Sequence, residues 1–192
     1  MNSKAFSWAV RFAMVLVLAV ATGALAEPGT PVHFSGIIND YSPSNVMPMG
    51  PWEIRGQWTL TLNPETGKAD FSAALNMERS DYWVSTNFQD PTNPSLRSAH
   101  THHITIKGGS VTPINGGFEV SGPITITKDG SPAPFSPSEL HVDITGGTSL
   151  KFSNITLMFQ GDAKSAIVHF GTQAIHGVVR KTSGAQPDND AQ

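Results

Sequence analysis

The stretch 52–62, WEIRGQWTLTL, decides the fold class of this chain. Apolar residues or glycine occupy every second position from Trp52 to Leu62, and the residues between them are polar. Successive side chains of a β-strand point to opposite faces, whereas a helix would mix the two sets. The pattern therefore predicts a strand with one face toward a core and the other toward water.

The alternation continues on both sides of this stretch. The turn-forming residues 63–67, NPETG, lead into a second run in which Ala69, Phe71, Ala73, Leu75 and Met77 alternate with polar residues, which predicts a β-hairpin. Further strands are expected at 32–38, 104–106, 111–114, 118–126, 140–144, 150–159, 166–170 and 175–180, with turns at the glycine pairs 108–109, 116–117 and 146–147.

These runs predict an all-β domain of about eight to ten antiparallel strands, with no helix after the N-terminal leader. A closed barrel is favoured over a two-sheet sandwich because a barrel leaves no free strand edge. The chain contains no cysteine, so no disulfide framework supports it.

Residues 1–26 have the layout of a signal peptide. Residues 1–11 contain Lys4 and Arg11 and no acidic residue. An apolar run covers 12–21, and Ala24-Leu25-Ala26 fits a cleavage site. The alternative is a retained anchor, but the apolar run is short for a bilayer of ~30 Å. We expect an exported protein, periplasmic or extracellular, with one domain at 27–181 and a disordered polar tail at 182–192.

The charge balance excludes one class of partner. All 15 acidic residues follow the leader, so its removal changes the net charge from −3 to −5. Nucleic-acid binding requires a basic face that neutralises phosphates. The sequence therefore predicts no nucleic-acid partner.

Two of the seven histidines stand two residues apart, at His100 and His102. By parity they share the face of Ile104 and Ile106, so they are expected to point inward at the start of a strand. Side chains at such positions lie about 6 to 7 Å apart along the strand, within reach of one transition-metal ion such as Zn or Cu.

A metal site needs a third ligand. His169 on a later predicted strand is one candidate, and Met47 or Met49 in a proline-rich loop is another that would suit Cu(I). Val168 and Phe170 look like the inward residues of that later strand, which would turn His169 outward. The two inward imidazoles could instead hydrogen-bond a ligand or pair with buried backbone groups.

The long segment 79–99 lacks alternation but contains Tyr82, Trp83 and Phe88. Segments of this length within a compact domain are often binding loops or lids. Aromatic residues in a loop are expected to pack on something. We therefore expect this loop to cover His100 and His102 at the barrel end and to contribute to ligand binding.

Three functional hypotheses follow. The first is a binding protein that holds a small hydrophobic or amphipathic molecule in a mouth with histidines on its rim. The second is a metal- or histidine-dependent enzyme acting on a small molecule in the same pocket. The third is a structural or assembly protein of the cell envelope or extracellular matrix.

Overall fold

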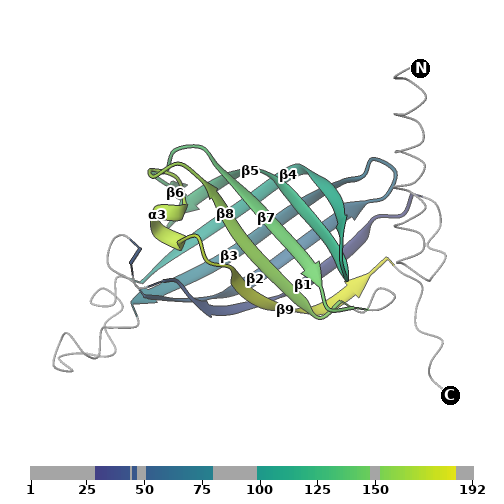
Figure 1. Cartoon of the computed structure of the whole chain (residues 1–192), viewed down its shortest axis with the longest axis horizontal. Helices are drawn as coiled ribbons and strands as arrows, with labels where there is room; N and C mark the ends of the chain where they lie inside the picture. Colours follow the sequence, from purple (N-terminus) through teal and green to yellow (C-terminus); the bar gives the residue numbers. More distant parts are fainter. Residues whose placement is uncertain (1–28, 44, 47–50, 80–98, 148–151, 185–192) are drawn as a thin grey trace.

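The computed structural model describes residues 29–43, 45–46, 51–79, 99–147 and 152–184 (Figure 1). The predicted signal peptide at 1–26 and the loop residues Tyr82, Trp83 and Phe88 lie outside the described residues. Among the described residues, none of the helices has the length and apolar character needed to span a membrane.

The described chain consists almost entirely of strands. Their bounds, with those of one short helix, are β1 Val32–Tyr41, β2 Trp52–Asn63, β3 Lys68–Arg79, β4 His100–Ile114, β5 Gly117–Lys128, β6 Ser131–Pro132, β7 Ser138–Thr145, β8 Asn154–Gly161, α3 Ile167–Phe170 and β9 Ile175–Ser183. Thr182 and Ser183, assigned above to the tail, thus belong to the last strand.

The strands close into an antiparallel barrel. Hydrogen bonding follows the order β4-β3-β2-β1-β9-β8-β7-β5, and β4 also pairs with β5, so the circle of eight strands is complete. The two-residue β6 pairs with the end of β5, outside this circle. The predicted all-β barrel is confirmed, and the sandwich alternative is wrong.

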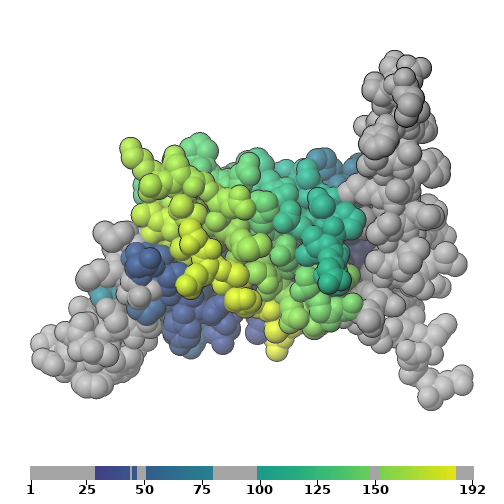
Figure 2. All heavy atoms as spheres, viewed as in Figure 1, coloured from purple at the N-terminus to yellow at the C-terminus, as the bar shows by residue number. Residues whose placement is uncertain are grey.

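Alternate side chains fill the barrel. The apolar inward side chains of the 52–62 stretch are buried as predicted, and Gly56 in the same row is partly exposed. Trp58 lies near Phe71 of β3 with ring centroids 6.4 Å apart. An eight-stranded barrel is just wide enough for side chains to fill its interior. Figure 2 shows a continuous wall over β5, β7 and β8 on the face in view.

One end of the barrel concentrates the features of interest. The strands β1, β3, β5 and β8 end there, β2, β4, β7 and β9 begin there, and α3 and β6 lie at the same end (Figure 1). We call this end the mouth. Its polar and aromatic side chains come from segments that are far apart in the sequence.

Two local predictions are wrong. Residues 166–170 were expected to form a strand, but Ile167–Phe170 form a single helical turn that ends at Gly171, where φ is 85°. A short apolar run does not distinguish a strand from a buried helical turn. Gly108 and Gly109 were expected in a hairpin turn, but they lie inside β4, where the register with β5 shifts between Ile106 and Ser110.

Candidate functional site

His100 and His102 enter the mouth from the first residues of β4. Their exposed fractions are 7% and 0%, whereas His103 between His102 and Ile104 is exposed. This alternation agrees with the inward orientation that parity predicts. The beginning of strand β4 therefore places two imidazoles side by side in the barrel interior.

The third histidine comes from the helix. His169 is 5% exposed, and both His169 and Phe170 are buried. The prediction that Phe170 would turn His169 outward is wrong because it assumed a strand. Neighbouring residues of a helix lie about 100° apart, so both can face the interior.

The three imidazoles converge. His100 Nε2 lies 3.0 Å from His169 Nε2, and each of the three residues offers a nitrogen within 4.8 Å of the others. The ring centroids of the three pairs are 4.9 to 5.1 Å apart. In tetrahedral coordination, three nitrogens that each lie 2.0–2.1 Å from the ion are about 3.4 Å from one another. Small side-chain shifts would therefore complete a site.

The hydrogen bond of His102 orients its ring for coordination. Its Nδ1–H donates to the carbonyl oxygen of Thr127 on β5 at 3.0 Å, because a carbonyl can only accept. Its Nε2 then carries a lone pair, and among the described residues this buried nitrogen has no hydrogen-bond partner. Metal-binding histidines characteristically donate their other ring nitrogen to a carbonyl or carboxylate in this way.

The surroundings of His102 keep it neutral. Burial, followed by the positive charges that His169 and His100 can carry, lowers the pKa of His102 from 6.5 to about 3. The hydrogen bond to Thr127 acts in the opposite direction but is outweighed. Neutral imidazole is the form that binds metals, so this histidine is ready to coordinate well below neutral pH.

Aromatic rings enclose the cluster. The ring centroid of Trp52 lies 5.0 Å from that of His100, Phe170 lies 5.1 Å from His102, and Phe135 stacks on His169 at 5.9 Å. Trp52 was predicted only as a core residue, and Phe135 and Phe170 were not assigned to the site. The inward parity of Trp52 at the start of its strand was the one signal available.

The helical turn that carries His169 is anchored to the start of β7. The backbone N–H of Ala166 donates to Ser138 Oγ at 2.9 Å, and Ser165 Oγ donates to the carbonyl of Asp162 at 2.7 Å. The ring of Phe170 stacks on Phe159 of β8 with centroids 4.3 Å apart and planes 13° apart. These contacts hold the third imidazole against the barrel.

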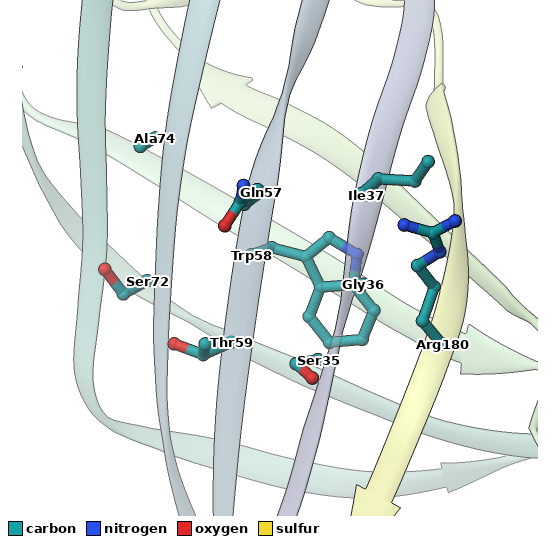
Figure 3. A pocket seen from close by; sticks show the side chains of 9 residues that line it. All are labelled: Ser35, Gly36, Ile37, Gln57, Trp58, Thr59, Ser72, Ala74 and Arg180. Atoms are coloured by element: carbon teal, nitrogen blue, oxygen red, sulfur yellow. The ribbon is translucent and has the colours of Figure 1, made fainter.

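A separate hollow lies on the outer wall of the barrel. It has a volume of about 560 Å³, and its lining includes Ser35, Gln57, Ser72 and Arg180 of four adjacent strands (Figure 3). Trp58 reaches behind Gly36 at its floor. The lining mixes polar and apolar side chains and contains none of the three clustered histidines, so this hollow is distinct from the mouth.

His141 and Asp143 lie on the outer face of β7, and His141 has a partner on the neighbouring strand β5. His141 Nδ1 lies 3.0 Å from Glu119 Oε2 of β5, and Glu119 is opposite Asp143 in the strand register. Burial, with the neighbouring charge of Glu119, raises the pKa of Asp143.

The predicted ligand residues thus divide into two groups. The structure brings His100, His102 and His169 together, whereas Tyr82, Trp83 and Phe88 lie outside the described residues, as do Met47 and Met49. Comparison with known proteins adds no relative to this picture: no protein-family model, no curated protein and no solved structure matches the chain.

Proposed function

We propose that this protein is an exported barrel that binds one transition-metal ion at its mouth through His100, His102 and His169. The observation that supports the proposal best is the lone pair on His102 Nε2, which is buried, without a hydrogen-bond partner among the described residues, and within 4.8 Å of nitrogens of the other two rings. A buried polar atom without a partner costs free energy. A metal ion coordinated by this nitrogen would remove that cost.

The histidine pair supports the same assignment. A 3.0 Å contact between two Nε2 atoms requires one ring to donate and the other to accept. An ion bound to both Nε2 atoms would replace this shared proton, which would move to the other nitrogen of its ring or to solvent. Because only unprotonated nitrogens bind a metal, acidification would oppose binding. Three imidazoles are a ligand set suited to Zn and Cu.

The test is a metal titration of chelator-stripped protein without an affinity tag. The proposal predicts one Zn²⁺ or copper ion per chain, with binding abolished in His102→Ala and retained in His103→Ala. His103 is the matched control because it is the next residue along β4 and faces outward. Equal binding by both variants, or no binding by the parent protein, would contradict the proposal.

A second candidate function is direct binding of a small amphipathic molecule at the same mouth. The acceptor on His102 and the rings of Trp52 and Phe135 favour it, since they place one polar atom among apolar walls. Predicted loop residues Tyr82, Trp83 and Phe88 would complete this pocket. Native mass spectrometry of metal-free protein distinguishes the candidates, because only this one predicts a bound organic molecule.

Metal binding would also permit chemistry on a small molecule that reaches the ion. A bound ion lowers the pKa of coordinated water and polarises carbonyl groups. The metal-dependent form of the enzyme hypothesis therefore depends on the metal proposal. The assembly hypothesis gains no support from edge-to-edge strand pairing, since each of the eight barrel strands is paired on both sides.

A further inference from the structure

A methionine lies beside the histidine cluster. Met77 belongs to the inward row of β3 and its side chain is 0% exposed. In the β3–β4 register it is directly opposite His100, and Leu75 is opposite His102. Directly opposed residues of an antiparallel pair have Cβ atoms about 4.5 to 5.5 Å apart on the same face. The thioether of Met77 is therefore within side-chain reach of the position where the imidazoles converge.

The candidate donors that the structure describes at this position are uncharged in their metal-binding form. The group of candidate ligands consists of three histidines, and in the described part of the chain no carboxylate belongs to it. The neighbouring charges that act on His102 are those of His169, His100 and Lys128, all of which are positive when protonated. These described donors would leave the charge of a bound ion unneutralised.

Burial then discriminates between ions by charge. The cost of moving an ion out of water rises with the square of its charge, so a divalent ion pays about four times as much as a monovalent one. The aromatic rings of Trp52, Phe135 and Phe170 supply a medium that compensates charge poorly. Monovalent copper is the ion that this environment penalises least, and thioether sulfur is one of its preferred ligands.

We infer that the ion is Cu(I), held by His100, His102 and His169 with the sulfur of Met77 as a fourth donor. The inference rests on the proposed metal site and specifies its ion and its fourth ligand. Binding involves no change of oxidation state: copper arrives and stays as Cu(I). The one proton shared by the Nε2 atoms of His100 and His169 moves to the other nitrogen of its ring or to solvent.

The test uses the full mature protein under anaerobic conditions. Cu(I) is presented as its coloured complex with bathocuproine disulfonate, and Zn²⁺ is presented with a chromophoric chelator, so loss of colour measures transfer to the protein. Met77→Leu keeps the volume and apolar character of the side chain, so the fold should persist. Met158→Leu is the matched control because Met158 lies on β8 opposite His141, which faces the outer wall.

The inference predicts that the parent protein binds Cu(I) more tightly than Zn²⁺. It also predicts that Met77→Leu weakens Cu(I) binding by at least about 10-fold, since removing even a group that only supports a ligand costs that much. Zn²⁺ binding by this variant should be unchanged, which also verifies that the site is intact, and Met158→Leu should behave as the parent.

The outcomes separate the two proposals. Unchanged Cu(I) affinity in Met77→Leu, or tighter binding of Zn²⁺ than of Cu(I) by the parent protein, would overturn this inference and leave the three-histidine site standing. Failure of the parent protein to take up either ion would instead contradict the proposed function, the three-histidine metal site itself. Equal losses of Cu(I) and Zn²⁺ in Met77→Leu would also overturn the inference, because they would assign Met77 a packing role.

Discussion

His102 links the chemistry of the mouth to the stability of the metal-free protein. The folded protein keeps this imidazole neutral down to about pH 3, whereas the unfolded chain protonates it below about pH 6.5. The unfolded state therefore binds the additional proton across this interval. The stabilisation is complete above pH 6.5 and is lost as the pH falls toward 3.

We therefore expect the free energy of unfolding in the presence of a chelator to fall by up to about 1.4 kcal/mol per pH unit below pH 6.5 on account of this residue. His102→Gln, which can still donate to Thr127, should flatten the profile. Urea denaturation between pH 7 and pH 4 measures it, with His103→Gln as the control. Parallel profiles for His102→Gln and the parent protein would show that His102 is not held neutral.

Asp143 provides a second test at the residue scale. One of its carboxylate oxygens is buried without a hydrogen-bond partner among the described residues, and burial followed by the charge of Glu119 raises its pKa. A raised folded pKa means that the ionised carboxylate destabilises the fold as the pH rises above 3.8. Asp143→Asn should thus stabilise the protein at pH 8 and have no effect at pH 3.

The measurement is thermal or urea unfolding at both pH values. Glu139→Gln is a suitable control, since Glu139 lies on the same strand and is exposed. If Asp143→Asn were as stabilising at pH 3 as at pH 8, the effect would come from packing rather than from ionisation.

The residues of the site could be predicted only in part. Counting by twos correctly placed His100 and His102 on the inward face, because strand parity is set by local geometry. The same count predicts an outward His169, and this prediction is wrong because its segment is helical rather than a strand. Phe135 could not be assigned at all, since it lies in an irregular connection whose position depends on tertiary contacts.

At the scale of elements, glycine positions allow the barrel wall to close. Gly36 lies where the β1–β9 register shifts, and a Cβ at this position would lie 1.9 Å from the carbonyl oxygen of Val178 and 2.9 Å from Trp58 Nε1. Backbone atoms of the neighbouring strand cannot move aside without breaking ladder hydrogen bonds. Glycine is therefore required by the close approach of β1 and β9.

Gly36→Ala should lower the free energy of unfolding by about 1–3 kcal/mol, the usual cost of overpacking. Chemical denaturation measures this loss, and Ser35→Ala on the outer face is the control, with an expected change within ±0.5 kcal/mol. A Gly36→Ala variant as stable as the parent protein would show that β1 and β9 do not approach as closely as described.

Element boundaries show why sequence alone predicted most strands but not all of them. The long alternating runs of β2 and β3 were assigned correctly, since five or more inward positions leave little ambiguity. The glycines at 108–109 suggest a turn from the sequence, but they form a local irregularity inside β4. Glycine marks both turns and bulges, and the pairing partner decides which one forms.

At the scale of the whole molecule, metal binding is coupled to folding, because the three histidines come together only in the folded barrel. An ion that binds only the folded barrel stabilises it by about 2.7 kcal/mol when its free concentration is 100 times the dissociation constant. For a domain of this size the melting temperature should rise by about 5 to 10 °C.

Thermal unfolding followed by circular dichroism, with and without added metal, measures this rise. The variant with His100, His102 and His169 all replaced by alanine should show no shift at the same metal concentration. An equal shift in this variant would place the binding site elsewhere, for example at histidines on the outer wall.

The central claim is that three imidazoles at the mouth share one metal ion. Its most direct test is a crystal structure of the metal-loaded protein with an anomalous difference map recorded at the absorption edge of the added metal. The account predicts a single strong peak about 2.0 to 2.1 Å from one ring nitrogen each of His100, His102 and His169. A map with no peak among these three rings, although metal occupies other positions in the crystal, would contradict it.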